Sequence, residues 1–168
     1  MRFSALIFSV FSLLAVLFTL TGCDEHSNGP AAGAVSNDSV RISDGWVRMP
    51  PTPGMMTAGY FTIYNSSQQP HELVAVSSPQ FARVEMHESA MSEPAGGGMP
   101  MMTMNRLSSV VIPAGKVLEF KPGGNHLMLF DPVKPINPDE RYDFTLALRG
   151  EAGEQQLTVP FNTRSKDR

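Results

Sequence analysis

The stretch Gly123-Gly124-Asn125-His126-Leu127-Met128-Leu129-Phe130 contains a turn followed by a strand-like alternation. Glycine and asparagine accept the positive φ that hairpin turns require, so the first three residues predict a tight turn. After the turn, Leu127 and Leu129 fall on one face of a strand, whereas His126 and Met128 fall on the other. The stretch therefore predicts a hairpin strand that presents an imidazole and a thioether side by side.

This imidazole and thioether pair has two interpretations. Imidazole is a general ligand for late transition metals, and thioether is a soft ligand that selects Cu(I). Alternatively, His126 and Met128 only pack, because methionine is an ordinary filler of protein cores. The choice between a metal site and a packed hairpin depends on the rest of the chain.

The N-terminal segment has the features of a targeting signal. Arg2 precedes an apolar run from Phe3 to Leu20, which is followed by Leu20-Thr21-Gly22-Cys23. The run is long enough to span a bilayer, but small residues that end in a lone Cys are typical of a processing site. The motif resembles the bacterial lipobox, which implies removal of residues 1–22 as a signal peptide and lipid on Cys23. An uncleaved signal anchor is the alternative.

Composition restricts the class of the mature chain, which is long enough for one domain. Without Arg2 it has 12 basic and 16 acidic residues and no basic patch that would indicate a nucleic-acid partner. Cys23 is the only Cys, so no disulfide, redox dithiol or thiolate ligand is expected. Since the sequence has no Gly-x-Ser-x-Gly, P-loop or His-Glu-x-x-His motif, we expect no enzymatic activity.

The mature chain divides into a tether and a β-rich domain. Residues 23–39 are rich in Gly, Ala, Ser, Asn and Pro, which predicts a lipidated Cys and a flexible tether. Short β-type runs without helical periodicity predict an all-β sandwich or barrel over residues 40–163, with a tail over residues 164–168. Val40–Ile42 and Gly45–Arg48 are expected to form one strand with a break. The other expected strands lie at Ala58–Tyr64, His71–Val76, Ala82–His87, Met102–Leu107, Val110–Ile112, Val117–Phe120, His126–Phe130, Tyr142–Leu148 and Leu157–Phe161, and a loop is expected at Ser89–Pro100.

Methionines are concentrated in one segment of the chain. Six of the 11 lie between positions 86 and 104, among Gly, Ser, Pro and Ala residues that do not build a core. Exposed methionine in an oxidising compartment is liable to sulfoxide formation. The segment is therefore either a flexible hydrophobic recognition surface or a set of soft ligands for Cu(I). The six residues are Met86, Met91, Met99, Met101, Met102 and Met104.

One combination of residues resembles the metal site of a known family. It consists of His87, the methionine segment, and the pair His126 and Met128. These are the periplasmic copper chaperones called PCuAC, which have a cupredoxin-like Greek-key fold. The family motif is His or Met, ten residues, Met, 21 residues, His, one residue and Met. Here 21 residues separate Met104 from His126 and one separates His126 from Met128, but 16 separate His87 from Met104. The longer first gap indicates a loop insertion.

The resemblance implies a set of copper ligands. His87, Met104, His126 and Met128 occupy the motif positions. Met99 is a rival for the third ligand, because it lies one place from the family spacing to His87. Auxiliary ligands are expected among the other methionines of the segment, together with Met99 if it is not the third ligand. The auxiliary candidates are Met86, Met99, Met101 and Met102.

The resemblance extends beyond the ligands and implies a function. Further blocks similar to the family lie at Gly45–Arg48, Gly59–Asn65, Val84–Glu88, Ile112–Gly115 and Pro122–Leu129. The implied function is a monomeric Cu(I) chaperone, lipid-anchored on the periplasmic side of the bacterial inner membrane. It would receive copper from a donor protein and deliver it to a cuproenzyme, by resemblance cytochrome c oxidase.

Two other functions stay open at the level of sequence. One is a copper-sequestering resistance or storage protein that uses the same site with extra methionines. The other is a metal-independent interaction module that uses the methionine segment as a surface. A blue-copper electron carrier is disfavoured, because such a carrier needs a Cys thiolate.

Overall fold

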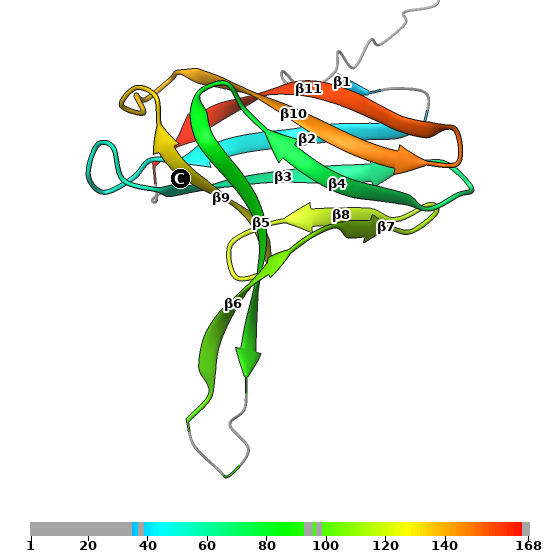
Figure 1. The fold of residues 1–168 in the computed structure, drawn as a ribbon, viewed down its shortest axis with the longest axis horizontal. Helices are drawn as coiled ribbons and strands as arrows, with labels where there is room; N and C mark the ends of the chain where they lie inside the picture. The colour runs from blue at the N-terminus through cyan, green and yellow to red at the C-terminus, as the bar shows by residue number, and fades with distance from the viewer. Residues whose placement is uncertain (1–34, 37–38, 93–95, 97–98, 166–168) are drawn as a thin grey trace, which may run out of the picture.

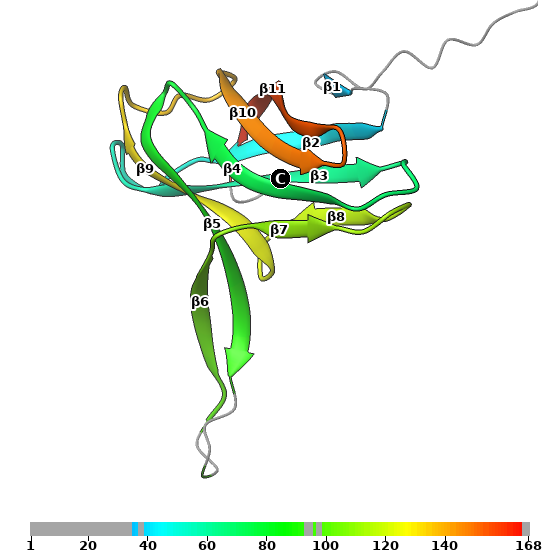
Figure 2. The same cartoon turned by 45° about the vertical axis from the view of Figure 1, so that its right-hand side comes forward.

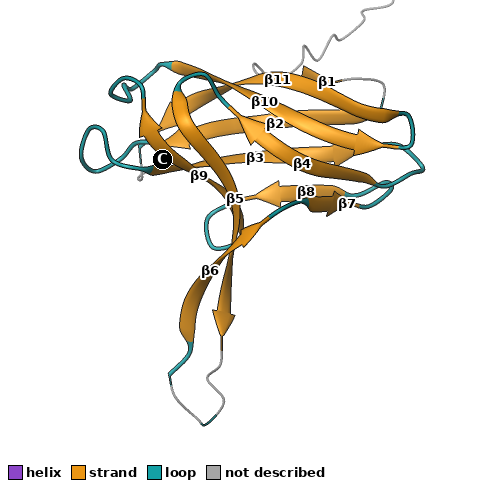
Figure 3. Cartoon of the chain, in the orientation of Figure 1, coloured by secondary structure: helices purple, strands orange, loops and turns teal. Residues whose placement is uncertain are grey.

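The fold is built from strands alone in the computed structural model, which describes residues 35–36, 39–92, 96 and 99–165. Figure 3 shows strands joined by loops, and the described residues contain no helix. The prediction of an all-β fold is confirmed. The strands are β1 (Val35–Ser36), β2 (Val40–Arg48), β3 (Thr57–Asn65), β4 (His71–Ser77), β5 (Phe81–Ser92), β6 (Met101–Leu107), β7 (Val110–Ile112), β8 (Val117–Phe120), β9 (Asn125–Pro132), β10 (Arg141–Gly150) and β11 (Gly153–Arg164).

One continuous hydrogen-bonded sheet contains these strands. Its order is β6-β5-β9-β8-β3-β2-β11-β10-β4-β7, with β1 paired to β2 and an additional pairing of β9 with β3. Strands far apart in sequence are neighbours, since β2 pairs with β11 and β5 pairs with β9. Figures 1 and 2 show an elongated body from which the hairpin of β5 and β6 projects.

The core is formed by alternate residues of the strands, as a period of two requires. Leu127 and Leu129 of β9 are fully buried, which agrees with the predicted alternation after the turn. The rings of Phe144 on β10 and Phe161 on β11 stack with centroids 4.3 Å apart. None of the buried core residues comes from β6, so the projecting hairpin is held by backbone pairing more than by burial.

β2 is one strand with a break, as its sequence predicts. Its register against β3 shifts between Ser43 and Trp46. Within the break, Asp44 has a positive φ of 56°. Gly45 lies against the ring of Phe161, and a Cβ built on this glycine would come within 3 Å of three ring carbons. A close approach of backbone to a core ring therefore requires glycine at this position.

We expect Gly45→Ala to lower the free energy of unfolding by about 1–3 kcal/mol, because overpacking a well-filled core displaces side chains and backbone. Urea denaturation, monitored by circular dichroism, measures the change in the free energy of unfolding. Gly124→Ala is the matched control, since its Cβ would lie 3.6 Å from the nearest atom of Lys121, an ordinary contact. Equal stability of the two variants would contradict the tight packing of Gly45 against Phe161.

Three predicted boundaries differ from the structure. β5 continues to Ser92 although Ser89–Pro100 was expected to be a loop, because Ser89–Ser92 pairs with Met101–Met104 of β6. Val35–Ser36, within the expected tether, forms β1 on β2. β11 extends to Arg164, whose carbonyl accepts a hydrogen bond from Met49 N at 2.8 Å, so the tail begins later than expected. In each case backbone pairing with another strand creates or extends a strand beyond the local composition signal.

The predicted signal peptide over residues 1–22, Cys23 and residues 24–34 of the tether lie outside the described residues, as do residues 166–168 of the tail. Within the described part of the chain, no helix is long and apolar enough to cross a membrane.

Candidate metal centre

The turn before β9 places His126 and Met128 as the sequence predicts. Gly123 has a φ of 79°, and Lys121 N donates to Asn125 O at 2.7 Å across the turn. The strand that follows buries its leucines, while His126 and Met128 share the opposite face. His126 is 6% exposed and Met128 is half-buried.

His87 of β5 lies directly beside His126. The two residues are partners in the antiparallel register of β5 and β9, so their side chains lie on the same face of the sheet. Their ring centroids are 5.9 Å apart. The fold therefore brings together two imidazoles that are separated by 38 residues in the sequence.

Each imidazole has one nitrogen held by an acceptor of the protein. Nδ1 of His126 lies 3.0 Å from the carbonyl oxygen of Gly124. A carbonyl only accepts hydrogen bonds, so Nδ1 is the donor of this bond, and in the neutral ring the lone pair is on Nε2. Nε2 of His87 lies 2.9 Å from a carboxylate oxygen of Glu85, whereas Nδ1 of His87 is buried without a partner. Nε2 of His126 and Nδ1 of His87 are thus the nitrogens available to a ligand.

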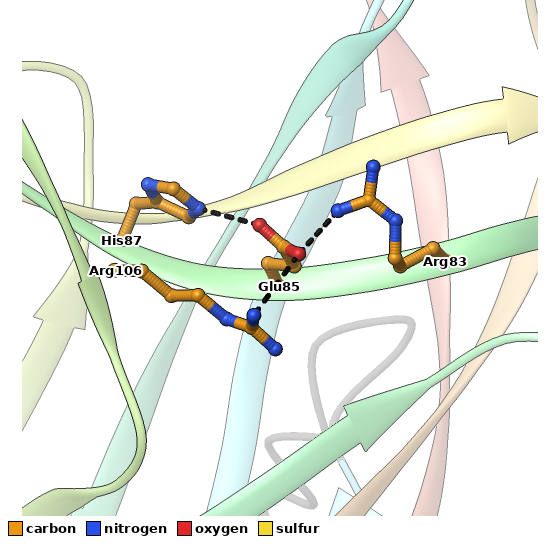
Figure 4. Close-up of polar contacts among 4 residues, drawn as sticks. All are labelled: Arg83, Glu85, His87 and Arg106. Carbon is orange, nitrogen blue, oxygen red and sulfur yellow. Dashed lines mark hydrogen bonds and ion pairs between the residues drawn. The ribbon is translucent and has the colours of Figure 1, made fainter.

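Glu85 is the centre of a charged cluster on β5 and β6 (Figure 4). One carboxylate oxygen accepts from His87, and the other is paired with Arg83 and, at 3.6 Å, with Arg106. The hydrogen bond from His87, together with the two arginines, lowers the pKa of Glu85 against the opposing effect of burial. The carboxyl is therefore an anionic acceptor, the arrangement that commonly orients a metal-binding imidazole.

Met104 is brought to the same face by the pairing of β5 with β6. It lies opposite Ser89, which is two residues after His87 and so shares its face of the strand. Met104 is 59% exposed and lines a pocket of about 380 Å³ together with His126 and Met128. Ser89 also lines this pocket. Three of the four motif residues thus border one pocket, and His87 lies next to it.

The auxiliary candidates are divided between different places. Met102 lines the pocket with Met104. Met86 is 5% exposed and packs in the core, because it lies on the face of β5 opposite to His87. Met101 also lies on the opposite face of its strand, and Met99 is 88% exposed near the hairpin tip. Neither Met99 nor Met101 lines the pocket, so we leave Met86, Met99 and Met101 out of the site.

Four residues near the site were not singled out from the sequence. Met56, Arg48 and Tyr60 line the pocket from β2, β3 and the loop between them. Burial raises the pKa of Tyr60, and Arg48 opposes this effect. Glu85 had a local signal, since its position two residues before His87 places both on one strand face. Nothing in the sequence indicated that the other three lie at the pocket, because β3 comes beside β9 only through tertiary pairing.

The donor set decides which metals fit. In the described part of the chain, no group of three or more His, Cys, Asp or Glu side chains is arranged to hold a metal ion. The pocket instead combines imidazole with the thioethers of Met104 and Met128. Neutral, soft donors of this kind suit Cu(I) better than hard cations such as Mg²⁺ or Ca²⁺.

The fold belongs to a class with solved representatives. The apo PCuAC domain of PmoF2 is 22% identical, with a TM-score of 0.60, and the match covers 81% of this chain and 97% of that domain. A copper-bound PCuAC domain from PmoF2 is 23% identical over 78% of this chain and 98% of that chain, with a TM-score of 0.58. The solution structure of CuI-DR1885 from Deinococcus radiodurans is 27% identical over 74% of this chain and 77% of that protein, with a TM-score of 0.52. The predicted cupredoxin-like fold and the resemblance to PCuAC domains are confirmed.

The chain belongs to the LpqE-like family, described as "Putative lipoprotein LpqE-like", which matches residues 40–161. It is 29% identical over 153 residues to "Putative lipoprotein Lxx21020" of Leifsonia xyli subsp. xyli (strain CTCB07). That alignment covers 89% of this chain and 86% of the relative.

Proposed function

We propose that this protein is a Cu(I) chaperone that receives copper and passes it to an acceptor protein. The observation that carries the proposal is a pocket lined by His126, Met104 and Met128, with the imidazole of His87 next to it as the cross-strand partner of His126. Each of the two imidazoles has only one nitrogen held by an acceptor of the protein. The similarity to a copper-bound PCuAC domain and to CuI-DR1885 supports the same metal and oxidation state.

The proposed ligands are Nδ1 of His87, Nε2 of His126, and the sulfurs of Met104 and Met128. All four donors are neutral, so the bound ion keeps its positive charge and exchanges readily with a competing ligand. Glu85 holds the ring of His87 in place, and the carbonyl of Gly124 holds the ring of His126. This arrangement combines oriented ligands with weak retention, which suits transfer to another protein.

The acceptor that the family resemblance implies is the copper site of cytochrome c oxidase. We infer that a separate donor protein supplies the copper and that the chaperone acts as a monomer. Pull-down of a copper-loaded protein with oxidase subunits tests the acceptor, and a loss of oxidase copper on deletion of the gene would be expected. Full oxidase copper content in the deletion strain would count against this acceptor.

The function is tested most directly by metal selectivity. We expect the purified protein, with Cys23→Ser to remove the only thiol, to bind one Cu(I) tightly and Zn(II) much more weakly, because soft ligands favour Cu(I). Competition with a Cu(I)-specific chelator and with a Zn(II) chelator gives the two affinities. A preference for Zn(II) would contradict the chaperone. Tight binding of several Cu(I) ions per chain would favour a copper-storage protein. The many exposed methionines make storage the second candidate function.

We also propose that lipid on Cys23 anchors the protein to the periplasmic face of the inner membrane, supported by the lipoprotein description of the family. The wild-type protein should fractionate with membranes, because several acyl chains anchor stably where one binds only marginally. Cys23→Ser should abolish lipidation and release the protein or block its processing. Mass spectrometry of the N-terminus decides the matter, and a mature chain that begins at another residue would refute it.

A further inference from the structure

Two thioethers at the pocket are not used by the proposed four-ligand site. Met56 lies immediately before β3 and Met102 lies on β6, and both line the same pocket as Met104, Met128 and His126. They are 53% and 60% exposed. Their side chains thus stand in the pocket and are still accessible from solvent.

The chain offers a direct contrast for each of them. Met55 and Met101 are the sequence neighbours of Met56 and Met102, and they are 49% and 65% exposed. Neither of these neighbours lines the pocket. On β6 the difference follows from alternation, because consecutive residues point to opposite faces of a strand. Exposure alone therefore does not distinguish Met56 and Met102 from their neighbours, but their place in the lining of the pocket does.

The register of β5 and β6 places Met102 next in line to a proposed ligand. Met102 and Met104 are two residues apart and lie on one face of β6, opposite Met91 and Ser89. Met56 comes from the loop that precedes β3, whose next residues Thr57 and Ala58 pair with β9 beside Met128. The two unused thioethers therefore flank the pocket from the hairpin and from the body of the protein.

We propose that Met56 and Met102 form a second, weaker Cu(I) station in this pocket, from which copper moves to the four-ligand site. This inference rests on the proposed function, because it takes Cu(I) as the cargo. Cu(I) tolerates low coordination, so a pair of thioethers can hold it briefly. Two thioethers offer fewer donors than the four-ligand site, so retention at this station is the weaker of the two.

Transfer between the two places is a ligand exchange. The sulfurs of Met56 and Met102 release Cu(I) as the sulfurs of Met104 and Met128 and the imidazole nitrogens bind it. Copper stays Cu(I), no electron is transferred and no proton needs to move, because thioethers and the free imidazole nitrogens bind without losing a proton.

The test is a Cu(I) titration of the purified protein, labelled with ¹³C at the methionine methyl groups and carrying Cys23→Ser throughout. The first equivalent should shift the methyl signals of Met104 and Met128. The second equivalent, delivered from a weaker chelator, should shift those of Met56 and Met102. Met55 and Met101 should not respond, since both are exposed but lie outside the pocket.

Leucine substitutions separate the station from general methionine binding. Met56→Leu and Met102→Leu should each weaken binding of the second equivalent by about tenfold or more, and tenfold corresponds to about 1.4 kcal/mol. The affinity for the first equivalent should stay within about twofold. Met55→Leu and Met101→Leu are the matched controls and should change neither step. Each swap nearly conserves volume at an exposed site, so folding is expected to be retained.

The outcomes are distinguishable from failure of the proposed function. Absence of a second binding step would overturn the station. Equal shifts of the methyl signals of Met55 and Met56 would also overturn it. The same holds if both Met56→Leu and Met102→Leu bind the second equivalent as tightly as the unsubstituted protein. If Met56 and Met102 serve only to pack against a protein partner, the first equivalent of Cu(I) would bind tightly and no second binding step would follow. Absence of tight binding of the first equivalent would instead count against the chaperone itself.

Discussion

Replacing His126 by alanine is expected to weaken Cu(I) binding by a factor of about a hundred or more. Loss of an outer-shell partner of a metal ligand already costs about 10–100-fold in metal affinity, and removal of the ligand itself should exceed this. The substitution deletes the nitrogen that the hydrogen bond to Gly124 leaves free for copper. Competition against a Cu(I)-specific chelator measures the loss.

Two companion variants test whether this loss is specific to the site. His26→Ala removes an imidazole from the predicted tether and should leave the affinity unchanged. Met128→Leu nearly conserves volume, so its cost in stability should stay below about 1.5 kcal/mol while Cu(I) binding weakens. If His126→Ala folds and binds Cu(I) within about threefold of the wild type, His126 is a packing residue and the proposed ligand set is incorrect.

The second large effect is expected at the third ligand. Met104→Leu should weaken Cu(I) binding by about tenfold or more, equivalent to about 1.4 kcal/mol. Met99→Leu should have little effect, because Met99 is 88% exposed and does not line the pocket, whereas Met104 does. The same chelator competition compares the two variants directly.

Shortening the hairpin tip provides an independent check. Removal of residues 93–98 should leave the affinity nearly intact, because the entropy of closing a connection changes only slowly with its length. The pairing of Ser89 with Met104 lies in the ladder of β5 and β6 and does not depend on the tip. A larger loss for Met99→Leu than for Met104→Leu, or a strong loss on this deletion, would transfer the third ligand to Met99.

Local sequence patterns were sufficient for much of the fold and for part of the site. The turn at Gly123 and the alternation after it predicted that Leu127 and Leu129 would share one face of a strand and that His126 and Met128 would share the other, and the structure buries the leucine face. Turn preferences and the period of two are properties of neighbouring residues, so a single stretch expresses them. The same reasoning predicted the break in β2 near Gly45.

The tertiary structure decided what depends on pairing between distant strands. The register of β5 with β9 sets His87 against His126, and the register of β5 with β6 turns Met102 and Met104 toward the pocket. The approach of Met56 depends on the pairing of β3 with β9.

At the site, the sequence determined which side chains are present, and the structure determined how they are arranged. The sequence by itself determined the available donor types, namely imidazoles that include His87 and His126 and an excess of thioethers, with a single Cys at the predicted lipidation site. The structure decided which nitrogen of each ring is free and which methionines face the pocket. The physical reason is that a one-residue change of register moves every side chain of a strand to the other face, and register is set by contacts between residues far apart in the chain.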